Sequence, residues 1–295
     1  MILTDLSLYI DRNKELVQKE LINQLDQLTI PEVLKESMLY SVEAGGKRLR
    51  PILLLASYEA YADKLEKALP TAVALEMIHT YSLIHDDLPA MDNDDFRRGK
   101  PTNHKVFNEA TAILAGDALL TYSFEIVGTD TGLSDEQRIR LVRMLAQVSG
   151  PTGMVGGQLL DMEAEDRAVS LEELERIHTL KTGELLRFAV FAGAYIAGAN
   201  EKQLAALEKF AYYLGLIFQV QDDILDVTGD QEKLGKPVGS DEENQKSTYP
   251  KLLGLKGAQN RKDYYVIEAK KALQLAGAEG STLMELTDYF SNRDY

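Results

Sequence analysis

Residues 83–104 read LIHDDLPAMDNDDFRRGKPTNH and place five aspartates and two adjacent arginines directly after an apolar helical segment. Asp86 and Asp87 fall on the last turn of that segment. Pro89 disfavours helix at the residue before it, so we expect Asp92 to come from a loop. Three carboxylates that converge at a helix end make a hard-oxygen site of the kind that magnesium uses together with a phosphate.

Arg97 and Arg98 follow these aspartates at once, and arginine forks match phosphate oxygens bidentately. A run of charges by itself is more often a solvated acidic turn with a basic tail. The interpretation as a binding site therefore depends on a second aspartate motif elsewhere in the chain.

That second motif is QVQDDILD at residues 219–226, inside a helix that is too apolar for a surface position. Asp222 and Asp226 share one helix face, and Asp223 lies one position round. Uncompensated buried carboxylates are costly. Two such triads that face each other would repel by about 1 to 4 kcal/mol per close pair, so we expect divalent cations between them.

Composition limits the class of protein. The chain has 295 residues, of which 45% are hydrophobic and 27% charged, so it is globular with a large core. It contains no cysteine, which excludes disulfides and thiolate metal sites. A net charge of −15 argues against nucleic acid as a partner. The N-terminus lacks the features of a signal peptide, and the longest charge-free apolar run, from Phe188, is too short for a bilayer. We expect a cytoplasmic protein without stable membrane insertion.

Helical periodicity dominates the sequence, and almost no segment alternates as a strand would. Ser134 with Gln137, and Ser170 with Glu173, predict capping boxes. Residues 228–245 form a polar, glycine-containing loop of functional length. We predict one all-α domain over residues 1–295 with ten or more helices and an inner layer of buried ones. The expected helices cover residues 5–27, 31–43, 49–62, 70–85, 108–127, 134 to just before Pro151, 153–164, 171–198 and 201–228, followed by three shorter helices.

Positive charge gathers at few places in this acidic chain. GGKRLRP at residues 45–51 sets Lys47, Arg48 and Arg50 between a double-glycine turn and a helix start, which is a plausible diphosphate cradle or a basic cluster that makes surface pairs. Lys181 beside Thr182 is a weak motif that also fits a surface turn. Lys236 follows the second aspartate motif, where it could fold over a bound phosphate.

The histidines raise an alternative. Glu76 with His79, and Glu175 with His178, have the Glu-x-x-His spacing of di-iron helical bundles. That interpretation leaves both aspartate motifs and the basic clusters unexplained. His79 is better interpreted as a hydrogen-bond donor. It lies one to two turns before Asp86 on the same helix and faces the same cavity.

The combination of GGKRLRP, HDDLPAMDNDDFRRGKPTNH, KTGEL, FQVQDDILDVTGD, LGKPVGSD and KSTYP resembles the trans-polyprenyl diphosphate synthase family, and most closely its bacterial members that form farnesyl diphosphate. The likeness runs from about residue 40 to about residue 255. It implies an all-α isoprenoid-synthase-type fold around a central active-site cavity, with the two aspartate motifs across its mouth, and a homodimer.

The resemblance also implies the chemistry. Isopentenyl diphosphate condenses with dimethylallyl diphosphate and then with geranyl diphosphate to give farnesyl diphosphate, by magnesium-assisted ionisation, condensation and elimination, with about three magnesium ions per active site. The implied catalytic residues are Asp86, Asp87, Asp92, Asp222 and Lys181, and the metal ligands are Asp86, Asp87, Asp92, Asp222, Asp223 and Asp226. Isopentenyl diphosphate is assigned to Lys47, Arg50, His79 and Arg98, and the allylic diphosphate to Arg97, Lys181, Thr182, Gln219 and Lys236.

Product length is expected to depend on the helix before the first motif. Tyr81 lies five residues before Asp86, more than one turn down the same helix, and an aromatic side chain there should stop the growing chain. In the family such a residue marks a fifteen-carbon product, and Ser82 belongs to the same chain-length position. The alternative is that Tyr81 is ordinary core packing.

Other outcomes remain open at this level. The same fold could make geranyl or geranylgeranyl diphosphate, or could belong to a non-catalytic subunit of a heteromeric prenyltransferase, although such subunits tend to lose the aspartate motifs. A class I terpene cyclase fits less well, because its second metal site usually has an Asn/Ser/Glu pattern and here it is QDDILD.

Overall fold

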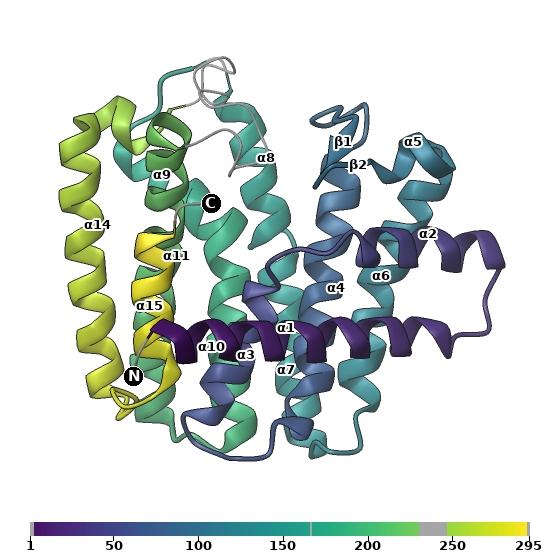
Figure 1. The fold of residues 1–295 in the computed structure, drawn as a ribbon, viewed down its shortest axis with the longest axis horizontal. Helices are drawn as coiled ribbons and strands as arrows, with labels where there is room; N and C mark the ends of the chain where they lie inside the picture. Colours follow the sequence, from purple (N-terminus) through teal and green to yellow (C-terminus); the bar gives the residue numbers. More distant parts are fainter. Residues whose placement is uncertain (1–2, 166, 230–246, 294–295) are drawn as a thin grey trace. The chain divides into compact units, whose positions relative to one another are not determined.

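The computed structural model describes residues 3–165, 167–229 and 247–293, and nearly all regular structure within them is helical (Figure 1). The described part contains two strands, β1 (Phe96–Arg97) and β2 (Lys100–Pro101), which pair antiparallel around Gly99. Two-residue strands are too short to leave an alternating pattern, which is why the sequence did not predict them.

The described residues form two compact units, one with residues up to 55 and 64–142, the other with residues 56–63 and those from 143 onward. The divisions fall inside the helices α3 (Leu49–Glu59) and α7 (Asp135–Ser149). The expectation of a single domain over residues 1–295 stays a prediction.

The first unit is organised around α4 (Leu69–Asp86), which packs against α1, α2 and α6. α4 is apolar on nearly all sides and most of its residues are buried, as an inner helix requires. Pro70 sits in its first turn, where the missing N–H costs nothing. The other elements of this unit are α1 (Leu3–Asp26), α2 (Glu32–Glu43), η1 (Leu65–Lys67), α5 (Asn103–Phe107) and α6 (Glu109–Thr129).

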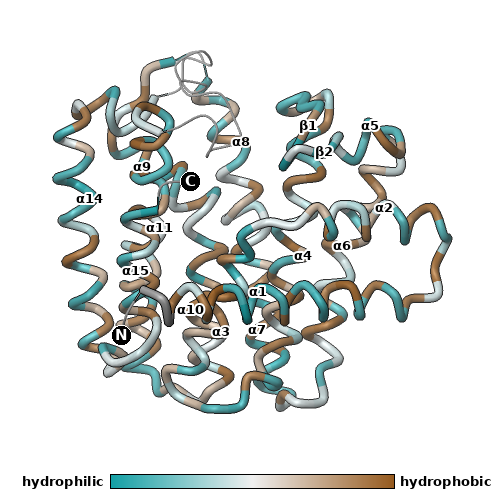
Figure 2. Tube along the Cα trace, in the orientation of Figure 1, coloured by the Kyte–Doolittle hydropathy of each residue, from teal (hydrophilic) through white to brown (hydrophobic). Residues whose placement is uncertain are grey.

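The second unit is organised around α11 (Glu201–Thr228), which packs against α9, α10, α14 and α15. α14 alternates between hydrophilic and hydrophobic stretches along its length, as expected for a helix with one buried face (Figure 2). The other elements are α8 (Met154–Ala164), α9 (Leu171–His178), the π-helical turn η2 (Thr179–Gly183), α10 (Glu184–Ala197), α14 (Tyr249–Leu275) and α15 (Thr282–Asn292).

The predicted helix starts are confirmed. Ser134 and Gln137 bond reciprocally through side chain and backbone at α7, and Ser170 with Glu173 does the same at α9. A third capping box, at Asn200, opens α11. The helix predicted over 171–198 is interrupted by η2, and α14 bends at Gly254, which has φ 71°.

One helix in the described part, α6, is long and apolar enough by length and composition to cross a membrane, and 39% of its most apolar stretch is buried inside the protein. It packs against α2, α4 and α5. A single helix of this kind is weak evidence for a membrane span, because helices of globular proteins pass the same test.

Candidate active site

The first aspartate motif lies at the C-terminal end of α4. α4 ends at Asp86, and Asp87 caps it. Pro89 then turns the chain, and the backbone N–H of Asp92 donates to the carbonyl of Asp86 at 2.9 Å. This turn returns Asp92 to the helix end. Asp86 is half-buried and Asp92 exposed, whereas Asp87 is buried.

Asp87 and Arg97 form a bidentate pair. The Arg97 Nε donates to both carboxylate oxygens of Asp87, at 2.7 and 2.9 Å, and its Nη2 lies 2.5 Å from Oδ1. Burial raises the pKa of the Asp87 carboxyl, although the Arg97 guanidinium acts in the opposite direction. The two arginines separate here, because the β1–β2 hairpin directs Arg97 to the aspartates and Arg98 elsewhere.

Arg98 lies against the double-glycine turn. It donates to the carbonyl of Gly45, and its guanidinium carbon lies 2.6 Å from where a Cβ on Gly46 would be. A side chain at Gly46 would therefore displace Arg98, and Gly46 also has φ +133°, which L side chains rarely adopt. The glycine pair is thus needed both for the conformation of the turn and for the space that the Arg98 side chain occupies.

Three of the four residues assigned to isopentenyl diphosphate form one basic cluster, namely Arg50, His79 and Arg98. The fourth, Lys47, is half-buried in the adjoining turn. Nη1 of Arg50 lies 3.2 Å from Nε2 of His79. Burial chiefly, together with the Arg50 and Arg98 guanidinium groups, holds the pKa of His79 well below its ordinary value. His79 is therefore neutral at physiological pH, and it can donate or accept a hydrogen bond there without adding a charge.

Arg48 does not join this cluster, contrary to the expectation that Lys47, Arg48 and Arg50 together form a cradle. It is 3% exposed and forms a buried ion pair with Glu76, 2.6 Å from Nη1 to Oε1. Arg48 has a left-handed backbone, φ 52°, and stands between the half-buried Lys47 and the buried Leu49.

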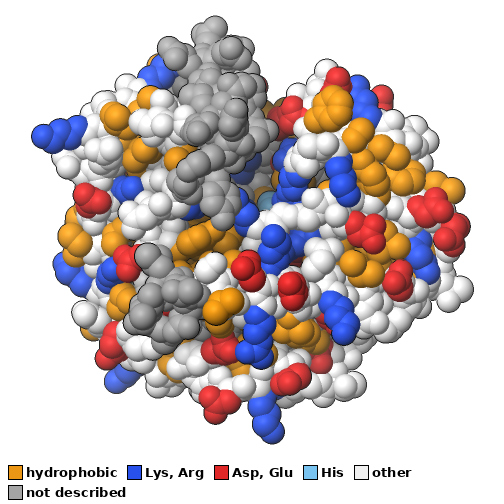
Figure 3. Space-filling view, in the orientation of Figure 1, with side chains coloured by type: hydrophobic (Ala, Val, Ile, Leu, Met, Phe, Trp, Pro, Cys, Tyr) orange, Lys and Arg blue, Asp and Glu red, His pale blue; other side chains and the backbone are white. Residues whose placement is uncertain are grey.

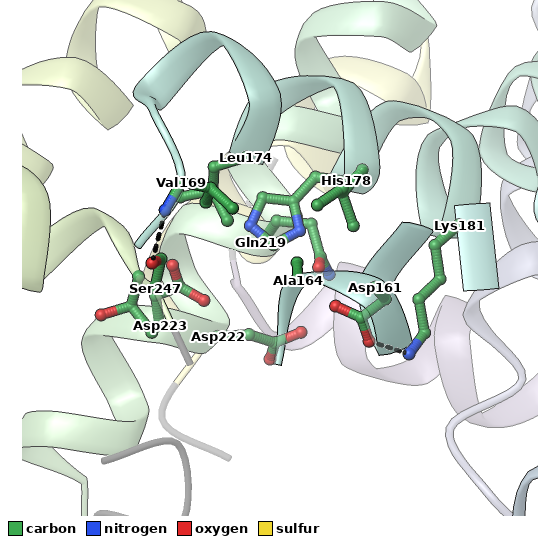
Figure 4. Close-up of a pocket in the computed structure, with 12 residues that line it drawn as sticks. Asp161, Ala164, Val169, Leu174, His178, Lys181, Gln219, Asp222, Asp223 and Ser247 are labelled. Carbon is green, nitrogen blue, oxygen red and sulfur yellow. Dashed lines mark hydrogen bonds and ion pairs between the residues drawn. The ribbon is translucent and has the colours of Figure 1, made fainter. Parts of the chain in front are cut away.

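The second unit contains a cavity of about 200 Å³ that is lined by both polar or charged and apolar side chains (Figure 4). Lys181 and Asp161 form an ion pair at its wall, 2.6 Å from Nζ to Oδ2. Gln219, Asp222 and Asp223 contribute the α11 side, and His178 the α9 side. The structure thus brings Lys181, Gln219 and Asp222 to one cavity, three of the residues that the sequence assigned to binding.

Two glycines let three elements meet at this cavity. A Cβ on Gly157 of α8 would lie 2.2 Å from the backbone nitrogen of Lys181. A Cβ on Gly215 of α11 would lie 3.0 Å from the Cα of Gly183. Asp161 and Gln219 each lie four residues, one turn, beyond these glycines and so face the same place. Thr182 is buried in the π-helical turn between them, so the Lys-Thr pair is no simple surface turn.

The three carboxylates of the second motif have different environments. Asp222 is 41% exposed at its side chain and pairs with Arg293, 2.6 Å from Oδ1 to Nη2. Asp223 is buried, and its Oδ2 accepts from the backbone N–H of Tyr249 at 2.8 Å, at the start of α14. Asp226 is buried and does not line the cavity. The assignment of Asp223 and Asp226 as metal ligands stays a prediction.

The chain-length residues lie on α4, before the first motif. Tyr81 is buried, and its ring meets that of His85 edge to face at 5.7 Å. Burial, and to a lesser extent Asp86, raises the pKa of Tyr81 to about 12. The Ser82 hydroxyl donates to the carbonyl of His79. Nε2 of His85 lies 2.2 Å from where a Cβ on Gly116 would be, so α6 holds the His85 ring in place.

The di-iron alternative has no support in the described residues. Glu76 is held by Arg48, and Glu175 accepts hydrogen bonds from Arg261 and Tyr265. Across the described ranges, no group of three or more histidine, aspartate or glutamate side chains lies close enough together to hold a metal ion. Lys236, and the loop expected over residues 228–245 from residue 230 onward, lie outside the described residues.

Sequence reasoning missed Asp161 and Arg293. Asp161 had a faint signal, because it stands one turn after a Gly-Gly pair inside a helix, where close backbone contact is expected. Arg293 had none, because it is separated from Asp222 by 71 residues of sequence. Arg293 is held beside Asp222 by the Phe218 ring, whose centroid lies 4.1 Å from the guanidinium carbon, and by the Phe218 carbonyl.

Comparisons with known proteins identify the family. Residues 31–277 match the family model described as polyprenyl synthetase. The chain is 50% identical to farnesyl diphosphate synthase of Geobacillus stearothermophilus, covering 97% of each chain, and 51% identical to that of Bacillus subtilis, covering 98% of this chain and 99% of the relative. A solved FPP/GFPP synthase from Zymomonas mobilis, in its apo form, matches with a TM-score of 0.86 at 36% identity, covering 99% of this chain and all of the other. The all-α fold is therefore that of the isoprenyl diphosphate synthases, and the chain belongs to the polyprenyl synthetase family.

Proposed function

We propose that this protein is a short-chain trans-prenyltransferase that condenses isopentenyl diphosphate with dimethylallyl diphosphate, and then with geranyl diphosphate, to give farnesyl diphosphate. The observation that carries the proposal is the C-terminal half of α4, where Asp86 ends the helix beside Asp92, and His79, seven residues earlier, joins Arg50 and Arg98 in the basic cluster. Carboxylates at the end of a helix that also contributes to a cluster of diphosphate-binding groups suit two diphosphates bound side by side. The similarity to farnesyl diphosphate synthases at about half identity supports the same product.

The reaction requires charge separation in a dry pocket. The allylic C–O bond breaks, and its electron pair leaves with the diphosphate. The double bond of isopentenyl diphosphate then attacks the carbocation, and loss of a proton restores an alkene. The protein provides no nucleophile in this scheme. Its residues hold the leaving diphosphate and the isopentenyl diphosphate in fixed positions, which is where the catalytic advantage arises.

The donor set fits magnesium. Asp86, Asp92 and Asp222 offer carboxylate oxygens at partly exposed positions, the hard ligands that Mg²⁺ prefers while it keeps several waters. Asp86 and Asp92 in the first unit, and Asp222 in the second, would each contribute a ligand to an ion that is completed by water and diphosphate oxygens, with Asp87 contributing where Arg97 releases it. Bound magnesium would neutralise the departing diphosphate. The number of ions, about three by family resemblance, belongs to this proposal.

We assign the cations by their surroundings. Arg50, His79 and Arg98, with Lys47 beside them, would bind isopentenyl diphosphate. Arg97 would bind the allylic diphosphate, as would Lys181, Thr182, Gln219 and Lys236. In the present state Arg97 and Lys181 are held by Asp87 and Asp161. Those carboxylates keep both cations extended until a diphosphate competes for them.

We further propose a cytoplasmic homodimer without stable membrane insertion. α6 leaves large apolar side chains at the surface, with Ile113 42% and Leu114 59% exposed. Hydrophobic side chains also gather at the surface over neighbouring α5 (Figure 3). An exposed apolar helix face suits an interface with a second copy. Sedimentation of the wild type and of Leu114→Glu tests this: the variant should sediment as a monomer, and an unchanged dimer would contradict it.

The purified chain, assayed alone with magnesium, isopentenyl diphosphate and dimethylallyl diphosphate, tests the function. Chromatography should show farnesyl diphosphate as the main product. Geranyl or geranylgeranyl diphosphate would indicate the alternative product lengths, and absence of turnover would indicate a non-catalytic subunit. Asp86→Ala and Asp222→Ala should each abolish turnover, and near-normal rates in either would count against the assignment.

A further inference from the structure

Arg48 is built into the interior by an unusually complete set of contacts. Its Nη1 donates to Oε1 of Glu76 at 2.6 Å, its Nη2 donates to Oε1 of Gln18 at 2.7 Å and to the carbonyl of Val42 at 2.5 Å, and its Nε lies 3.2 Å from the same Gln18 oxygen. One guanidinium thereby joins α1, α2 and α4. Four of its five N–H donors are engaged, and at 3% exposure the guanidinium is shielded from a diphosphate in the solvent.

The backbone at this point is constrained as well. Gly45, Gly46 and Arg48 have φ of 80°, 133° and 52°, so three of four consecutive residues lie in the left-handed region. Glycine tolerates this freely, whereas arginine does so only where surrounding contacts enforce it. The buried guanidinium supplies that enforcement, because its contacts hold the side chain inward.

The residues assigned to isopentenyl diphosphate surround this anchor. Lys47 precedes Arg48, and Arg50 follows it by two residues. His79 lies one turn beyond Glu76 on α4, and it is the partner of Arg50 at 3.2 Å. Arg98 rests on the Gly45–Gly46 turn that Arg48 terminates. Each cluster member therefore lies within three residues of Arg48 or Glu76 in the sequence, or contacts a residue that does.

The pair is poorly explained as a stabilising device. The second carboxylate oxygen of Glu76 is buried and has no hydrogen-bond partner among the described residues. Buried pairs seldom stabilise more than apolar side chains of similar volume, and an unsatisfied oxygen makes the balance worse. What the pair does provide is a fixed link between the glycine turn and α4, because Arg48 ends that turn and Glu76 belongs to α4.

We infer that Arg48, through its ion pair with Glu76, is a positioning residue for isopentenyl diphosphate, which fixes the glycine turn against α4 so that Lys47, Arg50, His79 and Arg98 converge on one diphosphate. The inference rests on the proposed function, in that it takes this cluster as the isopentenyl diphosphate site. Arg48 itself does not touch the substrate.

The test separates positioning from stability. Arg48→Met leaves the Glu76 charge stranded and should lower the melting temperature by on the order of 10 °C. The double variant Arg48→Met with Glu76→Leu replaces the pair by apolar side chains and should recover most of that loss. Its dissociation constant for isopentenyl diphosphate, measured by calorimetry, should nevertheless stay about tenfold above the wild type, with that for geranyl diphosphate unchanged.

Two further variants guard the interpretation. Leu25→Ala removes a fully buried side chain from α1, away from the pair, and should lose comparable stability while the affinity for isopentenyl diphosphate changes by no more than about twofold. Arg48→Lys keeps a positive charge beside Glu76 but lacks the guanidinium fork that reaches Gln18 and Val42. It should fold normally and bind isopentenyl diphosphate about threefold more weakly.

Wild-type affinity in the double variant, or in Arg48→Lys, would overturn the inference. An equal loss of affinity in Leu25→Ala would also overturn it, because instability alone would then suffice. The proposed function is judged separately: a wild-type protein that binds isopentenyl diphosphate but forms no product refutes that function and leaves the positioning role standing. A wild-type protein that does not bind it overturns the positioning role.

Discussion

Tyr81→Ala should lengthen the product. Tyr81 lies on α4 five residues before Asp86, which puts it about 7.5 Å nearer the start of the helix than the first aspartate. Its ring is buried against His85, and that histidine is in turn held by α6 at Gly116. A ring fixed in this way can block a chain that grows along α4, whereas an alanine cannot.

The structure also sets the cost of the change. Tyr81 is 5% exposed, and removing a large buried aromatic side chain typically costs about 3 to 5 kcal/mol. The melting temperature should fall by about 10 °C in a protein of this size. Activity should therefore be measured well below that temperature. Tyr81→Phe keeps the ring and should keep the wild-type product, since the hydroxyl, with a pKa of about 12, is neutral at any working pH.

Tyr58→Ala is the matched control. Tyr58, on α3, is 4% exposed, so its replacement removes the same side chain from an equally buried place on another helix. It should be destabilised to a similar degree and still release farnesyl diphosphate. Products of all three variants, separated by chromatography after incubation with excess isopentenyl diphosphate, give the answer. Farnesyl diphosphate alone from Tyr81→Ala, or longer products from Tyr58→Ala as well, would refute the reasoning.

Three other predictions concern groups with defined partners. His79 has a folded pKa below its ordinary value of 6.5, so its neutral form contributes stability above about pH 6.5 that is lost as the pH falls toward the folded pKa. His79→Gln should therefore lose less stability than the wild type between about pH 8 and pH 5 in urea unfolding, and an identical pH dependence would contradict this. Asp223→Ala removes the carboxylate that accepts from the Tyr249 backbone and should cost about 2 kcal/mol of unfolding free energy, whereas Asp223→Asn keeps an acceptor oxygen and should recover most of it; equal losses would show that the charge rather than the bond matters. Arg293→Gln removes a cation beside Asp222 and, at about 1 kcal/mol per pair of unit charges in water, should tighten divalent cation binding at least about fivefold in an Mn²⁺ titration of the substrate-free protein followed by electron paramagnetic resonance. Unchanged or weaker binding would mean that Arg293 orients Asp222 rather than competing at it.

Local signals in the sequence predicted most of the long helices and their starts, whereas the short elements α5 and η1 and the length of α14 were not predicted. The reciprocal bonds at Ser134 and Ser170 follow from residues three apart, and the turn that returns Asp92 to Asp86 follows from Pro89. Such features depend on neighbours within one or two turns, so the chain order alone contains them. The two-residue strands and the π-helical turn at Lys181 were not predicted, because each is too short to produce a periodic pattern of hydrophobic residues.

The sequence by itself determined that this chain is all-helical, that it carries two aspartate motifs and a basic glycine turn, and that it belongs with the isoprenyl diphosphate synthases. Only the tertiary structure decided what each charged residue of those motifs does. Arg48 and Arg50 are two residues apart in one motif, yet one is buried on Glu76 and the other meets His79. Asp222 and Asp223 are adjacent, yet one lies beside Arg293 and the other holds the start of α14. The reason is physical: a charge is assigned its role by burial and by the partner that satisfies it, and in both motifs that partner comes from a distant part of the chain.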